Sequence, residues 1–148
     1  MTRFRRILCA SDFSKMSGRS LALAIDVAKA NHARLMIVYA YVPIVPLVPE
    51  QYIDSSTWTR VDTETRRWIE RQLARLADRA RKAGVRASAI IVTGDPAQRI
   101  VRIARSKRVD LIVVGTHGRR GLSKFFLGSV AERVIATAPC PVLTVRGK

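Results

Sequence analysis

Short apolar runs alternate along the chain with longer stretches in which apolar residues recur at helical spacing. The apolar runs have the length of strands, and turn residues such as glycine, proline, serine and aspartate separate them. We predict five strands, which are Arg6–Ala10, Leu35–Tyr41, Ala87–Val92, Leu111–Val114 and Val142–Val145. Strands that alternate with helices indicate an α/β domain around a parallel sheet. The fourth run is almost wholly apolar, which is typical of a strand covered by helices on both faces.

The stretches between the strands predict four helices. Three of them span about Ser17–Ala30, Asp62–Lys82 and Pro96–Lys107, and the last follows Gly128 and Ser129. The apolar face of the second helix consists of Ile69, Leu73, Leu76 and Ala80. Gly84 is expected to end this helix, because glycine adopts the left-handed conformation at a helix C-terminus without strain. Asp95 is expected to cap the third helix, with Pro96 in its first turn.

The loop after the second strand contains Pro43, Pro46 and Pro49, a spacing that no regular strand ladder tolerates. Between the prolines lie the apolar residues Ile44, Val45, Leu47 and Val48. These residues could form a lid or a partner surface, or the loop could fold back over the sheet edge. The sequence leaves both interpretations open.

Length and cysteine content favour a single reduced domain. The 148 residues suffice for one domain over 1–148 with its own core, and no linker or internal repeat divides them. The two cysteines, Cys9 and Cys140, are too few for a disulfide scaffold or a zinc site with paired ligands, and Cys9 is expected in the core. The apolar run near the N-terminus is too short for a signal peptide or a membrane span. We therefore expect a soluble cytoplasmic protein without membrane insertion.

The chain is strongly basic. It has 27 Lys plus Arg against 11 Asp plus Glu, and a formal net charge of +16. Such a charge attracts polyanions at low salt. The basic residues are spread along the sequence, with no RNA-recognition signature, zinc-finger spacing or aromatic platform. These observations argue against sequence-specific nucleic-acid binding and leave a solvated basic surface as the simplest interpretation.

The segment GTHGRRGLSKFFLGSVAERV, between the fourth and fifth strands, carries the candidate chemistry. Gly115 and Gly118 would allow the backbone to turn sharply at the end of a buried strand. Ser129 followed by Glu132 fits a capping box, so Gly128 and Ser129 would lie at a helix N-terminus with free N–H groups. Phosphate oxygens bind well at such a terminus.

The spacing Gly115-x2-Gly118-x9-Gly128-Ser129 resembles the nucleotide-binding signature of ATP-binding universal stress proteins. The resemblance extends to SDFS after the first strand, to the GDP turn at Gly94 and to the C-terminal APCPVLTVR. It implies a Rossmann-like open sheet of five parallel strands in the order 3-2-1-4-5, with helices on both faces. It also implies a homodimer that pairs through the edge strand Val142–Val145.

By the same resemblance, the protein would bind ATP or another adenine nucleotide, with Mg²⁺ bridging the phosphates rather than sitting in a protein cage. Asp12 would receive the ribose and adenine side, and Ala40 would flank the base. Gly118, Gly128 and Ser129 would hold the phosphates. The remaining members of the predicted nucleotide-binding set are Gly115, Arg119 and Val130.

Several of these residues also have simpler interpretations that involve no ligand. Asp12 could cap the first helix, and Arg119, Arg120 and Lys124 could either neutralise a polyphosphate or be solvated. His117 has no nucleophile and orienting carboxylate that the sequence pairs with it. No Walker lysine or kinase catalytic loop is present, so at most a weak ATPase is expected.

Three functions follow. The first is a nucleotide-dependent regulator of stress adaptation with an unidentified protein partner and little or no turnover. The second is a basic interaction module without nucleotide, and the third is a slow ATP hydrolase.

Overall fold

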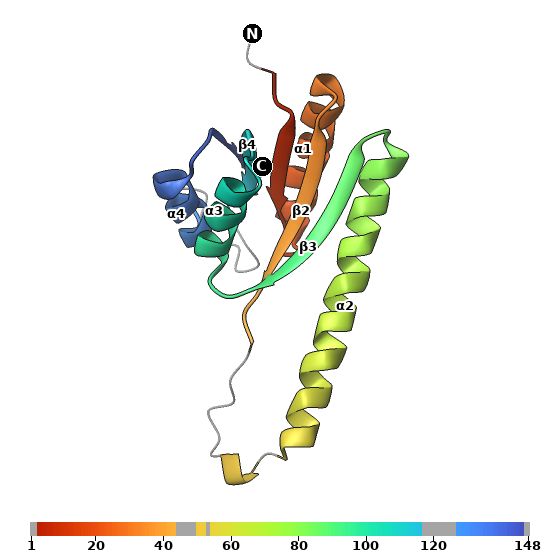
Figure 1. The fold of residues 1–148 in the computed structure, drawn as a ribbon, viewed down its shortest axis with the longest axis vertical. Coiled ribbons are helices and arrows are strands. Elements are labelled where there is room, and N and C mark those ends of the chain that lie inside the picture. Colours follow the sequence, from red (N-terminus) through yellow and green to blue (C-terminus); the bar gives the residue numbers. More distant parts are fainter. Residues whose placement is uncertain (1–2, 44–49, 53, 117–126, 147–148) are drawn as a thin grey trace.

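A computed structural model describes residues 3–43, 50–52, 54–116 and 127–146. Its centre is one sheet of five parallel strands in the order β3-β2-β1-β4-β5 (Figure 1). The strands are β1 (Arg6–Ala10), β2 (Arg34–Tyr41), β3 (Arg86–Thr93), β4 (Leu111–Gly115) and β5 (Val142–Val145). The predicted fold class and strand order are confirmed, and each predicted strand agrees with the structure to within a residue at either end.

Helices cover both faces of the sheet. Their bounds are α1 (Lys15–Asn31), α2 (Ser55–Lys82), α3 (Pro96–Ser106) and α4 (Ser129–Thr137), with a short 3₁₀ helix η1 at Glu50–Tyr52. One core lies between the sheet and the α1/α2 pair, and a second core lies between the sheet and the α3/α4 pair. Both pairs are visible in Figure 1, on opposite sides of the strands.

The neighbouring strands β1 and β4 are buried on both faces. Leu8 lies in register with Ile112, and both pack into the core beneath α3 and α4. The next pair, Cys9 and Val113, packs into the core beneath α1 and α2. Burial on both faces explains why these strands are continuous apolar runs without alternation. Cys9 is a core residue, as predicted, and burial raises the pKa of its thiol to about 12.

The start of α2 differs from the sequence prediction. The helix begins at Ser55, after the N-cap Asp54, rather than at about Asp62. Residues 55–61 are mostly exposed, and this end of α2 extends beyond the sheet (Figure 1). A helical segment that contacts no core needs no apolar face, so its sequence lacks the periodic signal by which helices are recognised.

At Asp62, α2 is hydrogen-bonded to the sheet. The hydroxyl of Tyr41, at the end of β2, donates to Asp62 Oδ1 over 2.8 Å. Arg66 donates to Asp62 Oδ2 and to Thr93 Oγ1, each over 3.1 Å. The hydrogen bond from Tyr41 lowers the pKa of Asp62, and that of Tyr41 is raised, chiefly by burial. These bonds join α2 to the carboxyl ends of β2 and β3.

The predicted helix boundaries at Gly84 and Asp95 are confirmed. Gly84 follows α2 with a φ of +88°, in the left-handed region that favours glycine. Asp95 caps α3 by accepting from the N–H of Gln98 over 2.9 Å, and Pro96 is the first residue of that helix. Asp95 also accepts two hydrogen bonds from Arg133, at 2.8 and 3.0 Å, which lower its pKa and tie α3 to α4.

Within the described residues, no helix has both the length and the apolar composition needed to cross a bilayer. The apolar positions of the proline loop, Ile44, Val45, Leu47 and Val48, lie outside the described residues. The two interpretations of that loop therefore stay predictions.

Candidate functional site

The strand order reverses between β1 and β4, and this reversal locates the candidate site. From β1 the chain crosses to β2 on one side, and from β4 it crosses to β5 on the other. Loops that leave such a pair of strands in opposite directions open a crevice at their carboxyl ends. Because Cys9 is in register with Val113, Asp12 and Gly115 follow at the same edge. We call this edge, formed by the carboxyl ends of β1 and β4, the switch edge.

Asp12 is half-buried in the turn between β1 and α1. Its Oδ1 accepts from the N–H of Ser14 over 2.9 Å. The N-cap of α1 is Ser14, whose side chain accepts from the N–H of Ser17. The alternative that Asp12 caps the helix is therefore wrong. Its carboxylate instead forms an Asx turn that holds the side chain at the switch edge.

The turn around Asp12 is fixed by its neighbours. The N–H of the buried Ser11 donates to Val38 O over 2.9 Å, and Ser11 Oγ accepts from the N–H of Phe13 over 3.2 Å. Phe13 has a φ of +62°, a conformation that costs a non-glycine residue about 1–2 kcal/mol. Its ring stacks on Tyr39 with centroids 4.6 Å apart and lies perpendicular to the ring of Trp68 with centroids 5.5 Å apart, contacts that offset the strain.

Sequence reasoning missed this aromatic cluster. Phe13, Tyr39 and Trp68 come from three separate elements, and neither their spacing nor their periodicity links them. A phenylalanine directly after a polar Ser-Asp pair was the available signal, because a large apolar residue in a turn needs an apolar partner.

The two ends of the glycine-rich loop meet at the switch edge. Thr116, directly after β4, is buried, and its N–H donates to Val145 O over 2.9 Å. Its carbonyl accepts from the N–H of Gly128, the N-cap of α4. The loop therefore leaves β4 and returns to α4 at almost the same point. Of the residues predicted in it, Gly118, Arg119, His117, Arg120 and Lys124 lie outside the described residues.

The predicted capping box at Ser129 is wrong. Ser129 is the first residue of α4, and Gly128 is the N-cap, with no side-chain cap. The backbone of Gly128 takes the extended cap conformation, so Ser129 is already helical and its exposed hydroxyl does not cap the helix. The N–H of Glu132 donates to Gly128 O over 3.0 Å. The amides of Ser129, Val130 and Ala131 precede the first intrahelical hydrogen bond, which is the geometry that suits an anion.

The remaining described residues of the predicted site lie on β2 and α4. Ala40 lies near the end of β2, in register with Val92 of β3. It is two positions beyond Val38, and Val38 is in register with Ala10 at the end of β1. Its small side chain therefore lies on the strand next to the switch edge. Val130 packs half-buried against the α3/α4 core, and its backbone N–H lies in the first turn of α4. Among the described residues, no group of three or more His, Cys, Asp or Glu could hold a metal ion.

An open sheet of this strand order, with a loop closed at the carboxyl end of β4, defines a doubly wound α/β protein of the Rossmann-like class. The sequence profile of the universal stress protein family matches residues 3–146. The chain belongs to the universal stress protein family.

Individual relatives support the same family assignment. A universal stress protein of Thermus aquaticus is 37% identical over 144 residues, which cover 97% of this chain and 99% of the relative. The fold is similar to that of a universal stress protein from Lactobacillus plantarum, with a TM-score of 0.86 over 99% of this chain and 100% of that chain, at 20% identity. A universal stress protein solved in complex with cAMP is 27% identical, with a TM-score of 0.74 over 98% of both chains.

Proposed function

We propose that this chain, as one universal stress protein domain over 1–148, binds an adenine nucleotide at the switch edge and acts as a ligand-dependent regulator with little or no turnover. ATP is the first candidate, with Mg²⁺ bound through its phosphates. The supporting observation is the convergence of Asp12, Gly115 and the first turn of α4 at one edge of the sheet. A related protein of the family has been solved with cAMP, an adenine nucleotide.

The chemistry of these groups matches the two ends of a nucleotide. A carboxylate accepts hydrogen bonds from the two ribose hydroxyls, and Asp12 is held for this by its turn. The amides at the start of α4 suit the phosphates, which the helix dipole also favours. Ala40 leaves room for the base beside β2. Gly118 and Arg119 complete the proposed phosphate site.

Calorimetric titration with Mg-ATP at moderate salt tests this function through an Asp12→Asn variant. Asparagine keeps the Oδ1 acceptor for the N–H of Ser14, so the turn should persist while the charge is lost. Because a hydrogen bond to a charged group contributes about 1.5–3 kcal/mol, affinity should fall by roughly tenfold or more. Asp26→Asn is the control, since Asp26 is an exposed carboxylate of α1 and its loss changes the net charge equally.

Equal affinities of the two variants, or no saturable binding by the folded wild-type protein, would refute the nucleotide site. Inorganic triphosphate at the same salt should compete poorly, because it lacks the base and the ribose that Asp12 and Ala40 would contact. Sustained Mg²⁺-dependent release of phosphate would instead show a hydrolase.

The proposal includes a cytoplasmic homodimer that pairs through β5. This strand lies at the sheet edge, where unpaired backbone groups can join a second copy around a two-fold axis. Its four residues are only half-buried. Sedimentation velocity at micromolar concentration should give the mass of two chains. A single species with the mass of one chain would exclude the dimer under those conditions.

A further inference from the structure

Three arginines stand side by side at the amino ends of adjacent strands. Arg6 of β1 is in register with Arg34 of β2, and Arg34 is in register with Arg86 of β3. Residues in register on neighbouring strands point to the same face, so the three side chains form a row across the sheet. Strands lie about 4.8 Å apart, so the row spans roughly 10 Å. We call these three residues the arginine row.

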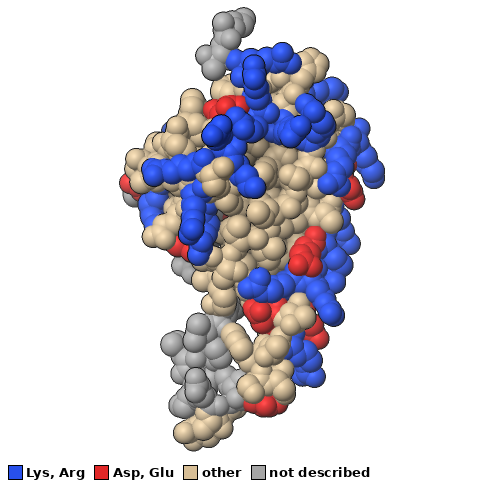
Figure 2. Space-filling model, viewed as in Figure 1, with Lys and Arg blue, Asp and Glu red and all other residues tan. Residues whose placement is uncertain are grey.

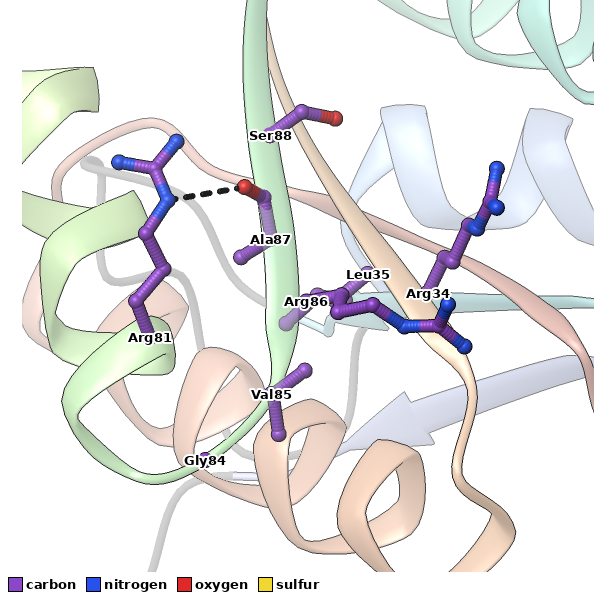
Figure 3. Close-up of a pocket in the computed structure, with 8 residues that line it drawn as sticks. All are labelled: Arg34, Leu35, Arg81, Gly84, Val85, Arg86, Ala87 and Ser88. Atoms are coloured by element: carbon purple, nitrogen blue, oxygen red, sulfur yellow. Dashed lines mark hydrogen bonds between the residues drawn. The ribbon is translucent and has the colours of Figure 1, made fainter.

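The row projects from the sheet face that carries α3 and α4. Along β1 and β2 the alternate residues Leu8 and Met36 pack into the α3/α4 core, and Arg6 and Arg34 share their side of the sheet. In the close-up of the adjoining groove, Arg34 and Arg86 extend to one side of β3, and Arg81 lies on the other (Figure 3). The groove has a volume of about 670 Å³ and lies opposite the switch edge, at the other end of the strands.

Further cations gather at this end of the molecule. Figure 2 shows Lys and Arg concentrated where β1, β2 and β3 begin. Arg5 precedes β1, Lys82 ends α2, and Lys107 and Arg108 follow α3. The nearby acid Asp110 accepts from the backbone N–H groups of Arg5 and Arg6, at 2.7 and 2.8 Å. Positions far apart in the sequence thus form one basic edge, which comprises the arginine row and these four cations.

Structural roles account for some of these charges but not for the row. Lys82 and Lys107 lie at the ends of α2 and α3, where cations stabilise a helix through its dipole. Arg81 is ion-paired with Asp78 and donates to the carbonyl of Ala87. Charges on an edge strand prevent aggregation, which would explain Arg86. That explanation fails for Arg6 and Arg34, because β1 and β2 are interior strands.

Within the described part of the chain, the side chains of the arginine row form no ion pair or hydrogen bond, and all three residues are exposed. Like charges directly opposite one another on neighbouring strands destabilise a sheet. An external anion would relieve the repulsion within the row.

The side chains exposed at the basic edge indicate which class of partner it can bind. The large apolar side chains exposed among the described residues are Val42, Tyr52, Val61, Trp68, Leu127 and Ile135, and none is at the amino ends of β1 to β3. A protein interface with an apolar centre, or insertion into a bilayer, thus has no anchor here. Among its described residues the edge also lacks an exposed aromatic ring on which bases could stack, which argues against single strands. Arginines in a row fit successive phosphates, which they bind in bidentate fashion.

We propose that the basic edge binds the phosphate backbone of a nucleic-acid duplex without reading its sequence, separately from the nucleotide site at the switch edge. The contacts would be electrostatic and each would release a counterion from the duplex. Because the two sites lie at opposite ends of the strands, duplex binding does not require the nucleotide site.

The test measures fluorescence anisotropy of a labelled mixed-sequence DNA duplex over a series of salt concentrations. The variant Arg6→Gln/Arg34→Gln/Arg86→Gln removes the row. The control variant Arg60→Gln/Arg67→Gln/Arg71→Gln removes as many exposed arginines from α2, none with a partner within the described residues. Loss of the row should lower affinity by about tenfold or more at low salt and reduce the slope of log K against log salt by roughly 2–3.

The control variant should stay close to the wild-type protein, and so should Asp12→Asn, whose carboxylate belongs to the other edge. Thermal unfolding verifies that each variant is folded. Equal losses in the two triple variants would overturn the proposal in favour of diffuse charge, and an unaffected row variant or a wild-type protein that does not bind would also overturn it. If the row variant loses binding only to phosphatidylserine vesicles, the surface serves membranes instead.

Discussion

Replacing Leu8 with alanine is expected to lower the free energy of unfolding by about 2–5 kcal/mol, the usual cost of such a truncation in a core. Leu8 has no exposed surface and lies on the central strand β1, between Met36 and Ile112 in register. Leu8 is enclosed within the core between the sheet and the α3/α4 pair, so its truncation leaves a closed cavity. Urea denaturation followed by circular dichroism measures the change.

Ile135→Ala provides the matched control, because Ile135 is 45% exposed on α4 and its truncation leaves no closed cavity. A change of less than about 1 kcal/mol is expected there, in line with surface substitutions generally. If Leu8→Ala cost no more than Ile135→Ala, β1 would not lie between two packed cores.

Gly94→Ala is expected to lower the free energy of unfolding by about 1–3 kcal/mol, because an L residue is strained in the conformation of this turn. Gly94 has a φ of +128°, and its N–H donates to Tyr41 O over 3.0 Å. An added Cβ would also lie 2.7 Å from Arg99 Nε, although that flexible side chain can move away. The strain is therefore in the backbone, next to the hydrogen bond that ties this turn to β2. Thermal or urea denaturation measures it.

Gly18→Ala is expected to change the free energy of unfolding in the opposite direction. Gly18 lies within α1, and a Cβ there would meet nothing within 4 Å. Alanine at this position should stabilise the protein by about 0.5–1 kcal/mol, because it restricts the unfolded chain and favours the helix. Equal effects of the two substitutions would contradict the backbone conformation described at Gly94.

The sequence predicted those elements whose signal is local. The five apolar runs form five strands. Helix boundaries lie where they were expected, at Gly84, Asp95 and Pro96, since each of these residues acts through its own backbone or its nearest neighbours. The prediction failed at the start of α2, where the helix extends away from the core and its residues have no buried face. It also failed at Ser129, because a capping motif does not fix which residue becomes helical first.

The candidate site was predictable in part. The glycine spacing and the polar turn after β1 pointed to the residues of the switch edge, and the family's strand order, confirmed by the structure, brings Asp12 and Gly115 to one edge. The contacts that fix the turn around Asp12 and the two ends of the glycine-rich loop were not predictable. The stack of Phe13 on Tyr39 and the bond between Thr116 and Gly128 join residues distant in sequence, and no periodicity encodes such contacts.

By itself, the sequence determined the class of fold and the buried faces of strands and helices, because hydrophobic periodicity is a property of short segments. The distribution of charge was decided only by the tertiary structure. Arginines that look evenly spread along the chain begin three neighbouring strands, and parallel pairing sets them in register as one row. Strand order, not local sequence, determines which charges become neighbours, since electrostatic interactions depend on distance in space.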